Sequence, residues 1–293
     1  MEKLHDCIDL APLHNPHNIK GIRAAQRLLP DIPQVGAFDT AFHSTLPDYA
    51  YIYGLPFILY KRYSIRRFGF HGASHFYVSQ ETAVFLNKPI EELKMITCHL
   101  GNGCSIAAVL YGKSIDTSMG FTPVEGLLMG TRCGDLDPSA ILYIMSREEL
   151  GLIEANALMN KHSGLQGISG VSSDMREIIE ETLKGNKQAE LALNVFCYRL
   201  KKYIAGYAAA MSGLDCIVFT GGIGEHGAEV RKRTLDNLEF MGIKLDLAKN
   251  QAAAGERALI SAPDSKISVV VMPTNEELVI AIDTERLVQQ MGK

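Results

Sequence analysis

The sequence lacks any hydrophobic run of the roughly 20 residues that a membrane-spanning helix requires. Its first residues also lack the charged and apolar segments of a secretory signal. Basic residues are in a slight minority, with 29 Lys and Arg against 33 Asp and Glu and a net charge of -4. We therefore expect no membrane partner, and no nucleic-acid partner, because there is no basic excess to neutralise phosphates.

Paired cysteine motifs are absent as well. The six cysteines are scattered and none of them forms a C-x-x-C pair. Such spacing excludes the usual zinc and disulfide frameworks and predicts reduced thiols in a cytoplasmic protein. With 293 residues, 47% hydrophobic and 21% charged, the chain has the composition of an ordinary globular enzyme.

A glycine-flanked turn is the most informative local pattern. Apolar segments at 95–100 and 105–110 read as two strands joined by the sequence GNG at 101–103. Glycines on both sides allow the backbone N–H groups of such a turn to approach an anion. No Gly-Lys-Ser/Thr follows, and a strand rather than a helix comes next, so this is neither a Walker loop nor a dinucleotide fingerprint. An ordinary surface hairpin is the competing interpretation.

A second glycine-rich segment, FTGGIGE at 219–225, ends another apolar strand. We interpret it as a second turn. Two glycine turns, each closing a strand, suggest a nucleotide held from two sides.

The remaining pattern predicts a mixed sheet with helices on its faces. Further strands are expected at 33–38, 113–117, 215–220 and 268–272. Loops are expected at 121–137 and 163–170. Helices are expected at 21–29, from the 67–75 segment to about 86, and at 138–146, 152–161, 174–184, 188–212, 228–240 and 276–290.

Several motifs, in order along the chain, resemble those of the acetate kinase family. They are APLHNP (11–16), FDTAFH (38–43), GFHGASH (69–75), HLGNG (99–103), GFTP (120–123), MGTRCG (129–134), TGGIGE (220–225) and PTNEE (273–277). The resemblance covers essentially the whole chain. It implies an α/β fold of the actin-like ATPase (ribonuclease H-like) class, with a mixed five-stranded sheet and flanking helices.

The sequence departs from the family in two respects. Family members begin with a strand and an Asn-x-Gly-Ser-Ser-Ser loop, which are absent here, and His226 stands where an Asn often occurs. The resemblance implies that 1–44 is a remnant of an N-terminal actin-like domain. It also implies a complete C-terminal domain at 45–275 and a helix at 276–293 that returns to the first domain. We expect such a chain to be a weak or inactive kinase by itself.

The implied reaction is the reversible, Mg²⁺-dependent transfer of the ATP γ-phosphoryl group to acetate, giving acetyl phosphate and ADP. By resemblance, Arg132, His71 and Asp39 are catalytic, and Asp39 and Glu276 orient Mg²⁺, with Mn²⁺ as an alternative metal. The implied substrate contacts are His14, Leu13, Phe70 and Pro123. The implied nucleotide contacts are His99, Gly101, Asn102, Gly103, Asp174, Met175, Arg176, Gly222, Ile223, Gly224 and His226.

Several alternatives stay open. Glu277 could exchange roles with Glu276, and His99 could only pack behind the phosphate turn. His43 and His75 are interpreted as structural. The function could also be that of a propionate or butyrate kinase, or of a non-catalytic nucleotide-binding or dimerisation fragment. The resemblance further implies a cytoplasmic homodimer.

Overall fold

The computed structural model describes residues 1–8 and 15–291. The chain forms two compact units, one made of Met1–Phe38 and Glu277–Lys293 and the other of Asp39–Glu276. The domain limits predicted at 44/45 and 275/276 refer to the architecture of a family and stay a prediction.

The smaller unit contains helices α1 (Glu2–Asp6) and α2 (Asn15–Leu28) and most of α14 (Glu276–Met291). The strand predicted at 33–38 is wrong, because this segment has no regular secondary structure. The segment begins with Pro33, which lacks an N–H, and no described strand pairs with it.

The larger unit is built on a mixed sheet in the order β3-β2-β1-β4-β6-β5. Its strands are β1 (Lys94–Leu100), β2 (Cys104–Leu110), β3 (Lys113–Thr117), β4 (Cys216–Thr220), β5 (Ala258–Leu259) and β6 (Ser268–Val271). Strands β1, β4 and β6 run parallel, whereas β2, β3 and β5 pair antiparallel with their neighbours. The predicted hairpin and meander are therefore confirmed.

The five predicted strands of the larger unit are all present, but the sheet has a sixth. Strand β5 has only two residues and pairs with Val270 and Val271 of β6. A two-residue strand is too short to show an alternating pattern, which is why the sequence did not indicate it.

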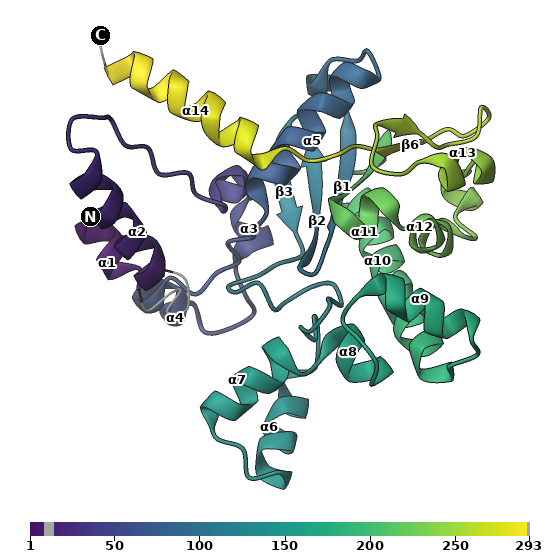
Figure 1. Ribbon diagram of the computed structural model, residues 1–293, viewed down its shortest axis with the longest axis horizontal. Helices are drawn as coiled ribbons and strands as arrows, with labels where there is room; N and C mark the ends of the chain where they lie inside the picture. The colour runs from purple at the N-terminus through teal and green to yellow at the C-terminus, as the bar shows by residue number, and fades with distance from the viewer. Residues whose placement is uncertain (9–14, 292–293) are drawn as a thin grey trace. The chain divides into compact units, whose positions relative to one another are not determined.

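Helices of the larger unit flank the sheet, and two of them, α5 (Gly72–Phe85) and α10 (Lys187–Ala210), lie on its two faces (Figure 1). The helices of this unit are α3 (Asp48–Tyr51), α4 (Phe57–Tyr63), α5 (Gly72–Phe85), α6 (Pro138–Arg147), α7 (Leu152–Lys161), α8 (Gly164–Ser169), α9 (Met175–Leu183), α10 (Lys187–Ala210), α11 (Gly221–His226), α12 (Ala228–Leu235) and α13 (Leu247–Ala252). Short 3₁₀ helices occupy Ala41–Thr45, Ile90–Glu92 and Glu239–Met241.

Three local predictions are corrected here. The loop predicted at 163–170 contains α8, and the second glycine turn is the first part of α11, which begins directly after β4. Gly221, with a φ of 74°, allows that abrupt change from strand to helix. The helix predicted at 228–240 ends at Leu235, and Asn237 then adopts a left-handed conformation.

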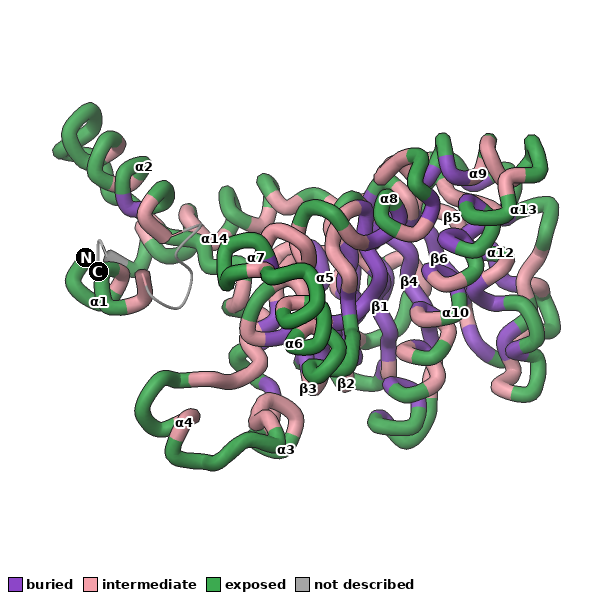
Figure 2. The backbone as a smooth tube through the Cα atoms, turned by 90° about the horizontal axis from the view of Figure 1, so that it is seen from below, coloured by how far each residue is buried: buried purple, intermediate pink, exposed green. Residues whose placement is uncertain are grey.

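Each face of the sheet contributes to its own hydrophobic core. Alternate residues of the strands point to opposite faces, so that Ile96, Cys98 and Leu100 of β1 join the core under α10, whereas Met95 joins the core under α5. Figure 2 shows β1 and β4 buried along most of their length. The sheet is therefore a central layer, and groups that follow its strands are held on a rigid support.

Candidate active site

The predicted site residues gather where the parallel strands end. Strands β1 and β4 run in register, with His99 opposite Thr220, so the two glycine segments follow at the same edge of the sheet. The start of α11 packs closely against the end of β1. A Cβ on Gly221 would lie only 2.8 Å from the carbonyl oxygen of Leu100. In open α/β sheets this edge is the usual place for a ligand.

The turn between β1 and β2 is closed by a hydrogen bond from Gly101 N–H to the carbonyl of Gly103, 3.0 Å long. Asn102 accepts a bond of 3.1 Å from Gly130 N–H through its own carbonyl. Its side-chain Oδ1 occupies the space beside Gly130, where a Cβ would lie only 2.0 Å away. The turn and the 129–134 loop are thus fitted directly against each other.

Backbone hydrogen bonds fix the 129–134 loop that carries Arg132. The carbonyl of Gly130 accepts from Gln166 N–H at 3.0 Å, and that of Arg132 accepts from Met129 N–H at 3.2 Å. Close packing excludes side chains here, since a Cβ on Gly164 would lie 2.3 Å from the carbonyl of Met129. Arg132 therefore has a rigid backbone although it lies in a loop.

The guanidinium of Arg132 is half-buried and points to the β1–β2 turn. Its Nη1 lies 3.4 Å from the carbonyl of Pro123 and 3.3 Å from where a Cβ of Gly103 would lie. None of the ion pairs between described residues includes Arg132. Burial lowers its pKa from the usual value. A partly desolvated cation without a carboxylate partner is suited to receive an anion.

His71 and Gly103 lie on the other side of this space. His71 precedes α5 in a left-handed conformation with a φ of 56°. Its backbone N–H donates to Oδ2 of Asp39 at 2.8 Å, and Gly72 N–H donates to the carbonyl of Asp39 at 2.8 Å. The Cε1 and Nε2 atoms of His71 both lie 3.5 Å from the Cβ position of Gly103. Asp39 thereby fixes an unusual backbone that aims the imidazole at the turn.

Four histidines cluster behind the turn. The rings of His71 and His99 are stacked with centroids 4.2 Å apart, and His75 lies edge-on to His43 and His99. Burial lowers the pKa of His43 and His71 to about 4 and that of His99 to about 3, and it lowers the pKa of His75 strongly. These rings are consequently neutral near pH 7, where they can act as hydrogen-bond donors without carrying charge.

Asp39 and Glu276 are the two carboxylates predicted to orient the metal ion. Burial and then the negative charge of Asp39 raise the pKa of Glu276. Two neighbouring carboxylates with this mutual repulsion fit a cation, which would relieve it. Among the described residues no group of three or more metal-binding side chains occurs.

Helix α11 is tied to the neighbouring connection by a residue that the sequence analysis did not select. The Oε1 atom of Glu225 accepts from Gly221 N–H at 3.0 Å and from Thr274 N–H at 3.4 Å. Gly222, by contrast, has no heavy atom within 4 Å of its Cβ position. Its backbone is accessible to a ligand, whereas Gly224 is buried.

Arg231 is another residue that the sequence did not indicate. Its side chain is fully buried and donates to the carbonyls of Gly224, Glu225, Asn250 and Ala253. Burial lowers its pKa to about 10. It joins the end of α11 to the end of α13, and only its position in three dimensions reveals this.

Other residues predicted to contact the nucleotide differ in their exposure. Asp174 caps α9 and forms an ion pair of 2.6 Å with the exposed Arg176. Met175 is buried in the core, so its side chain faces away from solvent. Ring atom Cε1 of the exposed His226 lies 2.6 Å from the Cβ position of Gly255, whose φ of 81° favours a glycine.

Two predicted residues, Leu13 and His14, lie outside the described residues. The ring of Phe70 packs against the main core, and its carbonyl bonds His43. The carbonyl of Pro123 bonds Arg132. The described structure therefore brings together Asp39, His71, Gly103 and Arg132, and it places Glu276 within electrostatic reach of Asp39.

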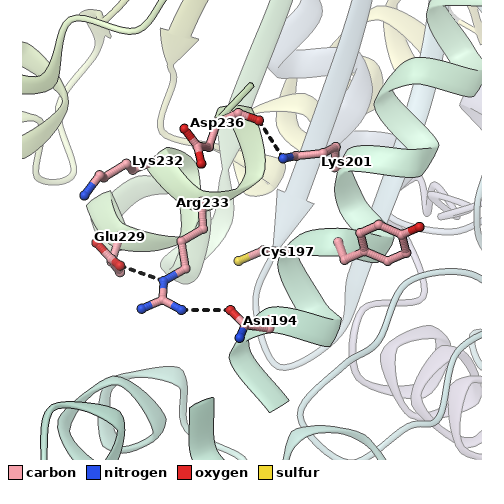
Figure 3. A pocket seen from close by; sticks show the side chains of 8 residues that line it. Asn194, Cys197, Lys201, Glu229, Lys232, Arg233 and Asp236 are labelled. Atoms are coloured by element: carbon pink, nitrogen blue, oxygen red, sulfur yellow. Dashed lines mark hydrogen bonds and ion pairs between the residues drawn. The ribbon is translucent and has the colours of Figure 1, made fainter. Parts of the chain in front are cut away.

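A separate hollow of about 480 Å³ lies between α10 and α12 (Figure 3). Arg233 there pairs with Glu229 and Asn194, and Lys201 donates to the carbonyl of Asp236. It contains none of the predicted site residues. Its polar groups largely satisfy one another.

All six cysteines are free, as the sequence predicted. In the part of the chain that the structure describes, no helix is long and apolar enough to cross a bilayer.

Known proteins resemble this chain over nearly its whole length. Residues 1–282 match the model of the acetokinase family. The acetate kinase of Thermoanaerobacterium thermosaccharolyticum is 60% identical over 292 residues, covering 99% of this chain and 73% of the relative. That of Acetivibrio thermocellus is 54% identical over 291 residues, with 99% and 73% covered.

Solved structures give the same result. The crystal structure of Porphyromonas gingivalis acetate kinase superposes with a TM-score of 0.95 at 48% identity, covering 98% of this chain and 72% of that one. A propionate kinase from Francisella tularensis gives 0.89 at 46% identity, with 96% and 71% covered. The predicted fold class, a mixed sheet with flanking helices as in actin-like ATPases, is confirmed. The chain belongs to the acetokinase family.

Proposed function

We propose that this protein is an acetate kinase, which transfers the γ-phosphoryl group of ATP reversibly to acetate. The observation that carries the proposal is the convergence of Arg132 and His71 on Gly103 at the end of β1. An unpaired arginine and an imidazole that face one glycine turn offer positive potential and a donor to an anion that the turn holds.

The chemistry requires little from a general base. Acetate is ionised near pH 7, so its oxygen is already a nucleophile. The obstacle is the repulsion between this anion and the γ-phosphate. In our proposal Arg132 binds the acetate carboxylate and then the charge that develops on the phosphoryl oxygens, and His71 donates to the same oxygens.

The remaining proposed roles follow the geometry around this centre. Asn102 and Gly103 meet the phosphates, assisted by Gly101 and His99. Asp39 and Glu276 would hold Mg²⁺, which supplies positive charge to the phosphates when it is bound. The proposed ADP contacts are Asp174, Met175, Arg176, Gly222, Ile223, Gly224 and His226, and the proposed methyl cup consists of Leu13, Phe70 and Pro123, with His14 nearby.

We further propose that the protein is a cytoplasmic homodimer. The adjacent helices α6 and α7 expose Leu142, Tyr143, Leu152 and Ile153, and the last two are 82% and 81% accessible. Burying such an apolar surface favours association. Leu152→Lys together with Ile153→Lys should shift the mass measured by sedimentation toward the monomer, and an unchanged mass would place the interface elsewhere.

The test of the main proposal is ATP-dependent formation of acetyl hydroxamate from acetate, hydroxylamine and Mg²⁺. Arg132→Leu should lower turnover by about 10²–10³-fold while ADP binding, measured by calorimetry, is retained. Arg132→Lys should rescue poorly, because a lysine cannot form two parallel hydrogen bonds to a carboxylate. Near-normal turnover of Arg132→Leu would refute the site assignment.

The same assay separates two alternative functions. Propionate replaces acetate in one series, because the related Francisella protein is described as a propionate kinase. A higher kcat/KM for propionate would make that acid the substrate. Nucleotide binding without any hydroxamate from either acid would indicate a non-catalytic nucleotide-binding chain.

A further inference from the structure

A chain of hydrogen bonds runs from the middle of β1 to the imidazole of His71. Thr97 Oγ1 and His75 Nδ1 are 2.7 Å apart, His75 Nε2 and Ser105 Oγ are 2.7 Å apart, and Ser105 Oγ and His71 Nδ1 are 2.9 Å apart. Thr97, His75 and Ser105 have no solvent exposure. They lie behind the site rather than in it. The direction in which these groups donate determines which ring nitrogen of His71 carries the proton.

Ser105 has a single hydroxyl proton and two imidazole neighbours. It can donate to His71 and accept from His75, donate to His75 and accept from His71, or accept from both rings. The last arrangement leaves the buried hydroxyl proton without an acceptor, since among described residues Ser105 Oγ bonds only these two rings. An unpaired buried donor costs about 1–3 kcal/mol. Two arrangements remain.

The hydrogen bond between Thr97 and His75 distinguishes these two arrangements. If Ser105 donated to His75 Nε2, then His75 would carry its proton on Nδ1 and donate to Thr97. The Thr97 hydroxyl would then need another acceptor, but its only hydrogen-bond partner within the described residues is His75. If Thr97 donates to His75 Nδ1 instead, the buried protons of Thr97, His75 and Ser105 all have acceptors, and the proton left over, on His71 Nε2, faces the site. The second direction is therefore favoured.

We propose that the buried chain Thr97–His75–Ser105 holds the imidazole of His71 with Nδ1 as acceptor and the proton on Nε2. Thr97, His75 and Ser105 are then positioning residues that act through His71. The Nε2 atom is the one that faces the Gly103 turn, 3.5 Å from its Cβ position, and it bonds no described protein group.

The orientation of this proton determines what His71 offers to an anion. With the proton on Nε2, the ring donates to a phosphoryl oxygen held between Gly103 and Arg132. With the proton on Nδ1, the ring would direct a lone pair at that oxygen and repel it. The role of this hydrogen-bond chain in binding a phosphoryl group rests on the proposed function. The direction of its hydrogen bonds follows from the bonds alone.

His43 provides an internal comparison. Its Nδ1 lies 2.8 Å from Ser114 Oγ, and its Nε2 lies 3.0 Å from the carbonyl of Phe70. A carbonyl only accepts, so His43 must carry its proton on Nε2 whatever Ser114 does. Ser114 is as buried as Ser105 and bonds the same kind of ring nitrogen. Ser114→Ala is therefore a matched control for Ser105→Ala.

The direct test uses the full chain labelled with ¹⁵N-histidine, because nitrogen chemical shifts and their couplings to the ring protons distinguish protonated from unprotonated ring nitrogens. The signals of His71 are identified by their loss in His71→Gln. We expect an unprotonated Nδ1 and a protonated Nε2 in His71, and likewise in His75. A protonated Nδ1 in His71 would overturn the proposal without any variant.

Variants test whether Ser105 is the cause. Ser105→Ala should shift His71 Nδ1 toward the average of the two tautomers, and Ser105→Thr, which keeps the hydroxyl, should restore the original shift. Ser114→Ala should leave the His71 signals unchanged. A His71 spectrum that stays at the wild-type position in Ser105→Ala would also overturn the proposal.

Turnover provides an independent readout. In the hydroxamate assay Ser105→Ala should lower kcat by at least about tenfold, and by less than the roughly hundredfold cost of removing a whole donor, with KM for ATP little changed. The spectra do not require turnover. An inactive chain with the expected tautomer would refute the proposed function alone, whereas an active chain with the opposite tautomer would refute this inference alone.

Discussion

Nη1 of Arg132 lies 3.3 Å from the point at which a Cβ of Gly103 would be, so these two residues bound one small space. A methyl group there would also contact the ring of His71. Gly103 therefore leaves this space open, because a side chain there would partly fill it.

The first prediction concerns Gly103→Ala. The added methyl should displace the guanidinium by a few tenths of an ångström and occupy the space that we assign to the phosphoryl group. Turnover in the hydroxamate assay should fall by about 10²-fold. The thermal midpoint should change little, because the neighbouring atoms belong to side chains that can move. Unchanged turnover would show that the transferred group binds elsewhere.

A second prediction separates ligand contact from folding at Gly222. No heavy atom lies within 4 Å of its Cβ position, so Gly222→Val should leave the free protein as stable as before. We expect it to abolish the calorimetric signal of ADP, since the side chain would lie where the backbone approaches phosphate. Gly21→Val serves as a control, because its Cβ position is equally open but lies in α2. Normal ADP binding by Gly222→Val would remove α11 from the nucleotide site.

The third prediction concerns the metal. Glu276→Gln should raise the Mg²⁺ concentration required for half-maximal turnover by about tenfold or more, because it removes one of the two carboxylates. The exposed neighbour gives the matched control, and Glu277→Gln should leave this concentration unchanged. The opposite result would assign the metal to Glu277, which was the alternative that the sequence left open.

The fourth prediction concerns acid stability. The folded-state pKa of His43 is lowered by burial to about 4 from the ordinary 6.5, so the unfolded chain binds a proton that the folded chain does not between these values. The free energy of unfolding must therefore rise with pH across this interval, and stability is lost as pH falls from 6.5 to 4. Each such histidine contributes up to about 1.4 kcal/mol per pH unit.

Urea unfolding at several pH values between 4.5 and 7.5 measures this slope. His43→Asn should reduce the slope by up to about 1.4 kcal/mol per pH unit, whatever its effect on overall stability. His162→Asn, at an exposed position, should leave it unchanged. Identical slopes for His43→Asn and the wild type would mean that His43 titrates alike in both states.

Strands β1, β2, β4 and β6 could be predicted because each one is largely a buried apolar run with a clear boundary. The failures occurred where the decisive interaction is remote in sequence. Strand β5 exists only through its pairing with β6, and α8 is held by backbone bonds to the 129–134 loop. At 33–38 the apolar pattern was present but the pairing partner was not.

The residues of the candidate site also divide into those that the sequence indicates and those whose role only the fold shows. Arg132, His71 and Gly103 could be selected through the resemblance of their motifs to a known family, and the structure brings the three together. Arg231 could not, since its role is to bind four backbone carbonyls that belong to two separate helices. Ser105 and Thr97 read as ordinary strand residues until the hydrogen bonds to the histidines are seen.

The glycine packing around the Arg132 loop has a consequence for how this protein tolerates variation. Loops normally accept substitutions and insertions more readily than strands do. Here a side chain on Gly130 would collide with Asn102, and one on Gly134 would lie 2.4 Å from the carbonyl of Leu127. In a library of all single substitutions, this irregular segment should be as intolerant as the central strands, and sequence drift should accumulate instead on exposed helical surfaces such as that of α13.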